Sequence, residues 1–365
     1  MDTVVLIPAY KPDMRLCVLA ESLKKSYLVL IVDDGSGREY DGVFEACKAH
    51  ATVLRYEVNR GKGGAMKYAF EKIPQLFPDA LCIVTADADG QHTAEDIEKT
   101  ASAQKEKGGL VLGSRAFCGD VPFKSKWGNA ITRFVFSVAS GKRVYDTQTG
   151  LRAFGREYLD EFSVLHGDRY EYEMTMLMYA AENKIPITEV EIETIYENNN
   201  EGSHFNPFKD SLRIYGVIYN NSTFLKCITS SLLSFFLEVL VLTLLSKFVF
   251  TGDAVVPAAL RGTPLEEFFD PAFVISWIIS SFFNYNLNRA WVFRSDIKYI
   301  KGLAGYYSLA IVTFFVKFLI YGLFKIILAG IPSDVVKNDI SDVIAATFMY
   351  IINYIVQKKI LFKKK

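Results

Sequence analysis

The chain has 365 residues, 50% of them hydrophobic, and carries 41 basic and 41 acidic side chains. Its length suffices for two domains, and its five cysteines lack the paired spacing of a disulfide framework or a zinc site. Charged and glycine-containing segments dominate up to about residue 221 and long apolar runs follow, so the zero net charge averages two unlike parts. We expect no nucleic-acid partner.

The N-terminal part begins directly with an apolar segment and lacks the features of a signal peptide, so we expect this domain in the cytosol. Up to residue 115 the chain alternates apolar and helical patterns, which predicts a mostly parallel sheet flanked by helices. We expect strands at residues 3–7, 28–32, 52–56, 81–85 and 110–112.

Polar motifs follow several of the predicted strands, where open α/β sheets bind their ligands. They are Pro8-Ala9-Tyr10, Asp33-Asp34-Gly35-Ser36, Asp87-Ala88-Asp89-Gly90-Gln91-His92 and Gly113-Ser114-Arg115. Asp87 and Asp89 offer hard carboxylate oxygens that suit Mg²⁺ or Mn²⁺, and Gln91 could add an amide oxygen. Taken alone, two acids after a strand also fit a solvated turn or a helix cap.

A glycine-rich segment, Asn59-Arg60-Gly61-Lys62-Gly63-Gly64-Ala65, lies between the third and fourth predicted strands. It would place glycines and Lys62 at a helix start, where free N–H groups favour an anion. The spacing is not that of a P-loop. Further along, Glu171 and Glu173 could position sugar hydroxyls or simply enrich a helix N-terminus in acids.

The C-terminal part contains four apolar stretches long enough to cross a bilayer, near residues 227–250, 272–293, 303–330 and 340–361. The loop between the first two is acidic, whereas Arg294, Lys298 and Lys301 follow the second span and five lysines close the chain. Because basic residues stay on the cytoplasmic side, the N-terminal domain and the C-terminus should both be cytoplasmic.

The second and fourth predicted spans share a pattern that suggests two tandem helical hairpins. Asn284-Tyr285 recurs as Asn353-Tyr354, and Asn288-Arg289 recurs as Gln357-Lys358. These amides predict either interhelical hydrogen bonds or a polar groove for a lipid phosphate. Because mid-span charges are costly, we also expect Glu238 and Lys317 to pair.

The motifs in this order resemble family 2 glycosyltransferases, and more closely the dolichyl- or polyprenyl-phosphate hexose synthases. The segments that carry the resemblance are Ile7–Tyr10, Val32–Ser36, Asn59–Ala65, Asp87–His92, Gly113–Arg115, Asn129–Arg133 and Asp146–Arg152. The four spans resemble the GtrA-like module. The resemblance implies an α/β, GT-A-like nucleotide-sugar transferase domain over residues 1–205, a juxtamembrane helix over 206–225 and an all-α membrane domain over 226–365.

The resemblance also implies roles for individual residues. It places Pro8, Tyr10, Asp33, Asp34, Lys62 and Asp87 at the nucleotide sugar, Asp87, Asp89 and Gln91 at the metal, and Asp89, Arg115 and Arg133 at the reacting phosphates. Asp146, Thr147, Gln148, Thr149, Ser203, Lys209 and Arg213 would meet the acceptor, although Lys209 and Arg213 could instead hold a juxtamembrane helix on anionic lipid.

The resulting hypothesis is an inverting, metal-dependent enzyme that transfers a hexose to a polyprenyl phosphate, in the inner or plasma membrane, for cell-surface glycan modification. UDP-glucose or a related UDP-hexose is the favoured donor and GDP-mannose the alternative, and the chain could form a homo-oligomer. A processive polysaccharide synthase is the competing enzyme class, but its Q-x-x-R-W motif is absent. A lipid-linked sugar flippase with a nucleotide-sensing domain is the non-enzymatic alternative.

Overall fold

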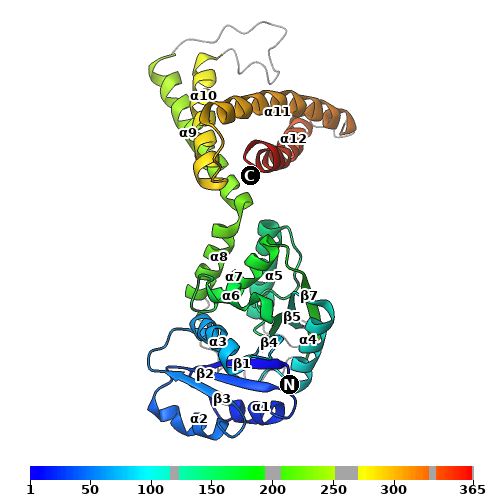
Figure 1. Cartoon of the computed structure of the whole chain (residues 1–365). Coiled ribbons are helices and arrows are strands. Elements are labelled where there is room, and N and C mark those ends of the chain that lie inside the picture. Colours follow the sequence, from blue (N-terminus) through cyan, green and yellow to red (C-terminus); the bar gives the residue numbers. More distant parts are fainter. Residues whose placement is uncertain (116–122, 194–205, 207, 251–269, 329–333, 364–365) are drawn as a thin grey trace. The chain divides into compact units, whose positions relative to one another are not determined.

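The computed structural model divides the chain into two compact units, Met1–Ser222 and Thr223–Lys365 (Figure 1). It describes all residues except 116–122, 194–205, 207, 251–269, 329–333 and 364–365. The predicted boundary at residue 205 and the acidic loop between the first two predicted spans fall outside the described residues. Each unit is considered by itself below.

The first unit is built on a seven-stranded sheet in the order β3-β2-β1-β4-β6-β5-β7. All neighbouring strands are parallel except β6, which runs antiparallel to β4 and β5. The strands are β1 (Thr3–Ala9), β2 (Leu28–Asp34), β3 (Thr52–Tyr56), β4 (Cys82–Thr85), β5 (Leu110–Arg115), β6 (Arg152–Gly155) and β7 (Ile187–Ile192). The five predicted strands are confirmed, with small shifts at their ends, and β6 and β7 are additional.

Helices cover the sheet and shield its apolar strands from solvent. Every residue of β1 is buried, as expected for a parallel strand covered on both faces. Leu16, Leu19 and Leu23 of one helix join the same apolar core. The helices of this unit are α1 (Arg15–Leu23), α2 (Asp41–Cys47), α3 (Lys62–Leu76), α4 (Ala94–Lys107), α5 (Phe123–Ser140), α6 (Leu159–Ser163), α7 (Glu171–Glu182) and α8 (Lys209–Asn221).

Strand β6 determines where the segment before it lies. Because β6 is antiparallel, its first residue Arg152 pairs with Thr85 at the end of β4 and with Leu112 in β5. The loop that precedes β6, residues 146–151, is therefore delivered to the edge of the sheet where the parallel strands end. That edge also carries the Asp87-Ala88-Asp89 motif.

The second unit contains α9 (Thr223–Phe248), α10 (Pro271–Leu287), α11 (Tyr299–Ile327) and α12 (Asp334–Val356). Within the described residues, three helical segments are long and apolar enough to cross a membrane: Thr223–Phe248, Tyr299–Phe324 and Ile340–Leu361. Helix α10, at the second predicted span, has 17 residues and continues into a π-helical turn, η6 (Asn288–Val292). A count of four spans therefore stays a prediction.

The sequence repeat in this unit corresponds to a repeat in structure. Helix α12 also ends in a π-helical turn, η7 (Gln357–Leu361), at the position equivalent to η6. Equivalent residues meet each other: the Asn288 amide donates to Gln357 Oε1 at 3.0 Å, and the Phe293 and Phe362 rings stack with centroids 5.0 Å apart. The two hairpins thus contact one another through the same pair of positions.

The predicted pairing of Glu238 with Lys317 is wrong. The Lys317 ammonium lies 2.8 Å from Asp342 Oδ1, and the Ser280 hydroxyl donates to Glu238 Oε2 at 2.6 Å. A mid-span position fixes the depth of a side chain but not the face of the helix on which it lies. Each charge has therefore found a partner on the following helix of its own hairpin.

Candidate active site

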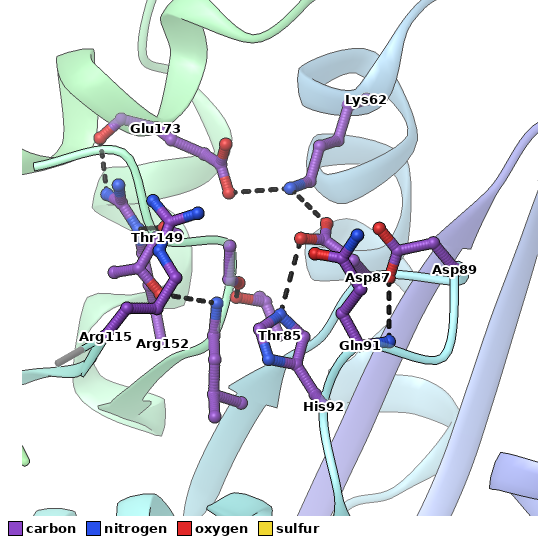
Figure 2. A network of polar contacts seen from close by, with 12 residues as sticks. Lys62, Thr85, Asp87, Asp89, Gln91, His92, Arg115, Thr149, Arg152 and Glu173 are labelled. Carbon is purple, nitrogen blue, oxygen red and sulfur yellow. Dashed lines mark hydrogen bonds and ion pairs between the residues drawn. The ribbon is translucent and has the colours of Figure 1, made fainter. Parts of the chain in front are cut away.

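The two aspartates of the Asp87-Ala88-Asp89 motif lie just beyond β4, at the edge where the parallel strands end (Figure 2). The backbone N–H of Gln91 donates to Asp89 Oδ1 at 3.0 Å, which closes the turn after the strand. The ring of His92 lies beneath Asp87, with Nε2 3.4 Å from Asp87 Oδ2. The turn thus presents two carboxylates, with a buried imidazole supporting the first.

A lysine bridges the first aspartate to a distant glutamate. Lys62 Nζ lies 2.5 Å from Asp87 Oδ1 and 2.9 Å from Glu173 Oε1 (Figure 2). Lys62 is the first residue of α3 and Glu173 lies in the first turn of α7, so two helix N-termini meet at this point. The side chain of Lys62 is only 14% exposed and that of Glu173 only 9%, which makes the bridge a defined element of the site.

The glycines before and after Lys62 allow this approach. A Cβ on Gly61 would overlap the Asp168 carbonyl oxygen, and a Cβ on Gly63 would overlap the Tyr172 side chain. Gly61 also has φ +90°, a conformation that favours glycine. The glycine-rich segment therefore does more than start a helix, because it lets the chain before and within α7 pack closely enough for Glu173 to reach Lys62.

Asp34 organises the same segment. Its carboxylate accepts hydrogen bonds from Tyr56 Oη at 2.6 Å, Asn59 Nδ2 at 2.9 Å, Arg60 N at 2.7 Å and Gly61 N at 2.8 Å. Asp33 is similarly engaged, by Arg55 Nε at 2.7 Å and by Ser36 N at 2.9 Å. Both aspartates are buried in this structure, and their contact with a nucleotide stays a prediction.

The loop before β6 is held by charged side chains from two strands. Arg115, at the end of β5, forms a bidentate ion pair with the fully buried Asp146, with Nε 2.6 Å from Oδ2 and Nη2 3.0 Å from Oδ1. From β7, the Glu189 carboxylate accepts from the backbone N–H groups of Tyr145 and Asp146. At the other end of the loop, Gly150 lies so close to Asp87 that a Cβ would overlap its carboxylate.

Arg152, the first residue of β6, holds this loop through hydrogen bonds to its backbone. Its guanidinium is fully buried and donates to three backbone carbonyls, those of Thr147 at 3.4 Å, Thr149 at 2.9 Å and Glu173 at 2.5 Å. The arginine therefore connects the loop to the start of α7, the helix whose Glu173 pairs with Lys62. Burial lowers the pKa of Arg152, although the nearby carboxylates of Glu173, Asp146 and Asp87 oppose this effect.

The charged groups of the site shift one another's pKa values. Burial alone would lower the pKa of Lys62, but the carboxylates of Asp87 and Glu173 outweigh it and raise that pKa. Burial opposes ionisation of Asp87, but the Lys62 ammonium and the His92 ring outweigh it and hold its pKa well below the usual range. For Asp89, burial and repulsion by Asp87 both raise the pKa. A cation beside both carboxylates would relieve that repulsion.

The donor set fits a divalent metal that is shared with a ligand. Among the described residues, no group of three or more His, Cys, Asp or Glu side chains is arranged to hold a metal ion. Asp87 and Asp89 nevertheless offer hard oxygens, and Mg²⁺ is commonly held by one or two carboxylates together with substrate phosphates and water. A metal in this place would complete its shell on a diphosphate.

The remaining predicted residues lie at several places in the first unit. Arg133 stacks on the Tyr145 ring with Cζ 4.9 Å from its centroid, and Lys11 Nζ lies 5.4 Å from the Tyr10 ring. Pro8 is buried in β1, Thr147 donates to Asn129, and Gln148 Nε2 lies 3.5 Å from Thr132 Oγ1. Arg213 donates to Asp210 on α8, Lys209 begins that helix, and Ser203 lies outside the described residues.

Three members of this cluster have contacts that the sequence patterns do not predict. The sequence offers Glu173 as a sugar-binding acid or as part of an acidic helix N-terminus, but not as the partner of Lys62, and it predicts no role for Arg152 or Glu189. Glu171, weighed together with Glu173, instead accepts from the backbone of Asp168 and Arg169 at the start of α7. The signal that could have found Arg152 was its position in an apolar strand, where an arginine must have buried partners.

Comparison with known proteins gives two family matches. Residues 4–162 match the model described as glycosyl transferase family 2, and residues 268–362 match the model described as GtrA/DPMS, transmembrane domain. Each match falls within one of the two units.

Several named proteins are similar to part of this chain. A UDP-N-acetylglucosamine–dolichyl-phosphate N-acetylglucosaminyltransferase from Methanococcus voltae is 31% identical over 219 residues, covering 53% of this chain and 85% of the relative. A dolichyl-phosphate beta-glucosyltransferase from Dictyostelium discoideum is 27% identical, covering 58% and 70%. A polyprenol monophosphomannose synthase from Mycolicibacterium smegmatis is 27% identical, covering 52% and 76%.

Proposed function

Because this chain belongs to glycosyltransferase family 2 and carries a GtrA/DPMS transmembrane domain, we propose that it transfers a hexose from a nucleotide sugar to a polyprenyl phosphate. The observation that carries the proposal is the contact of Gly150 with Asp87. It brings the predicted acceptor loop against the predicted metal carboxylate, so donor and acceptor would share one edge of the sheet.

The proposed reaction does not require a general base. A lipid phosphate is anionic at neutral pH, so its attack on the anomeric carbon needs no general base, unlike attack by an alcohol. The departing nucleoside diphosphate must instead be stabilised. A divalent metal would act there as a Lewis acid, held by Asp87 and Asp89 with Gln91 beside them.

The chain's own cations would bind and orient the two anionic substrates. Lys62 lies beside Asp87 and would meet the diphosphate there, whereas Arg115 carries a fixed charge at the end of β5 next to the Asp146 loop. In-line displacement in such a site would convert an α-linked donor into a β-linked lipid phosphate sugar. We favour UDP-glucose or a related UDP-hexose, with GDP-mannose as the alternative.

A donor panel tests this proposal. The purified chain is incubated with radiolabelled UDP-glucose, UDP-N-acetylglucosamine or GDP-mannose and a polyprenyl phosphate, and the organic phase is extracted. We expect one donor to give an acid-labile labelled lipid. Label in an insoluble polymer would favour a processive synthase, and absence of transfer from every donor would favour the flippase alternative.

A further inference from the structure

The Lys62 ammonium forms an ion pair with Asp87, the carboxylate that would bind the metal together with the donor. It lies 2.5 Å from Asp87 Oδ1, while His92 Nε2 lies 3.4 Å from Asp87 Oδ2 (Figure 2). Both oxygens of Asp87 therefore already have a partner within the chain. Asp89 accepts from the backbone N–H of Gln91, and among the described residues it forms no ion pair with a lysine.

The fold holds Lys62 in this place from two sides. Its backbone begins α3 directly after Gly61, which packs against Asp168, and its ammonium is shared with Glu173 at 2.9 Å. An ammonium and a divalent cation repel one another and compete for the same oxygen. The lysine stem is flexible and its three N–H donors can exchange partners without movement of the backbone.

We propose that Lys62 is a positioning residue that weakens metal binding to Asp87 until a nucleoside diphosphate is present. A bound diphosphate would attract the Lys62 ammonium away from Asp87, Glu173 would remain its partner, and Asp87 Oδ1 would then be available to hold the metal. This inference rests on the proposed function. It makes the metal and the nucleotide bind cooperatively, and by linkage each strengthens the other to the same degree.

The test is a pair of Mn²⁺ titrations of the full-length protein in detergent, with and without saturating UDP, in which free Mn²⁺ is followed by electron paramagnetic resonance. Lys62→Met removes the competing cation. We expect it to bind Mn²⁺ alone about tenfold more tightly than the wild type and to lose most of the enhancement by UDP. A role of Lys62 in folding alone would change the Mn²⁺ affinity in the opposite direction.

Lys67→Met is the matched control. Lys67 lies on the same helix and also pairs with an aspartate, its Nζ being 2.6 Å from Asp168 Oδ1, but it does not contact Asp87. We expect wild-type Mn²⁺ binding from this variant. Lys62→Gln, which keeps a polar terminus, provides a second version of the test if Lys62→Met does not fold, as judged by thermal unfolding.

The outcomes separate the two proposals. If the wild type binds both UDP and Mn²⁺ but the Lys62 variants bind Mn²⁺ alone no more tightly than it does, the inference is overturned and the proposed function stands. If the wild type binds neither ligand, both are overturned. Tighter Mn²⁺ binding by the Lys62 variants, together with weaker coupling to UDP, supports both.

Discussion

The two units use buried polar side chains in opposite ways. In the first unit, the polar cluster is charged: Lys62 is shared between Asp87 and Glu173, and Arg115 is locked on Asp146. In the second unit, the cluster at the meeting of the hairpins is neutral. Asn288 Nδ2 donates to Asn284 Oδ1 at 2.8 Å and to Gln357 Oε1 at 3.0 Å.

Charged side chains suit a cluster that binds ionic ligands, whereas neutral hydrogen bonds suit a cluster that packs helices. Further neutral contacts complete the second cluster: Ser230 donates to Asn288 at 2.6 Å, Asn284 to Ser234 at 3.0 Å and Tyr306 to Asn284 at 2.8 Å. These bonds favour the interhelical interpretation of the repeated amides over a groove for a lipid phosphate. In the charged cluster, by contrast, we propose that a diphosphate competes with Asp87 for the Lys62 ammonium and that a metal ion competes with Lys62 for Asp87.

The largest expected effect comes from the charged cluster. Asp89→Ala removes one of the two carboxylates that we propose hold the metal, and it should lower turnover at least about a hundredfold, because stabilisation of the leaving diphosphate would be lost. The measurement is transfer of labelled sugar to lipid at saturating Mn²⁺. Asp13→Ala, in an exposed aspartate that pairs with Arg15, should leave turnover unchanged. Near-wild-type turnover of Asp89→Ala would contradict the metal assignment.

A smaller loss of turnover should follow from crowding the same carboxylate. Gly150→Ala would drive its Cβ into Asp87, and displacement of a catalytic group by about 1 Å can cost up to about a hundredfold in rate. Gly216→Ala, where a Cβ would meet nothing within 4 Å, is the control. Equal turnover of the two variants, measured at matched protein concentration, would show that Asp87 tolerates the shift and that the loop contact is not critical.

The neutral cluster should respond in stability rather than in turnover. Asn288→Leu introduces a side chain of similar shape that cannot form the hydrogen bonds to Ser230, Asn284 and Gln357. We expect the free energy of unfolding to fall by about 1 kcal/mol, typical of hydrogen bonds between membrane helices. Asn286→Leu is the comparison variant: this half-buried asparagine, two residues earlier in α10, donates to Phe282 O and accepts from Tyr299 Oη, and because both bonds lie near the solvent-exposed surface their loss should cost less. Thermal unfolding in detergent measures both. A collapse of lipid glycosylation in a stably folded Asn288→Leu variant would assign this cluster a functional role.

The sequence predicted the local features of the fold well and its long-range contacts poorly. The parallel strands and the Asp87-Ala88-Asp89 motif follow from apolar runs and the residues that end them. Strand β6 has only four residues, all buried, and its antiparallel pairing depends on register with β4 and β5. The bridge from Lys62 to Glu173 spans 111 positions of the chain, and no local pattern encodes such a contact.

Metal-dependent sugar transfer to a lipid phosphate can be measured directly with the whole protein in vesicles that contain polyprenyl phosphate, using the donor that the panel selects. Wild type and Asp89→Ala are compared by the label that enters the organic phase. We expect an acid-labile labelled lipid to form with the wild type and divalent metal, and to disappear almost completely with Asp89→Ala or after chelation by EDTA. Equal labelling by both proteins, or label found only in polymer, would contradict this expectation.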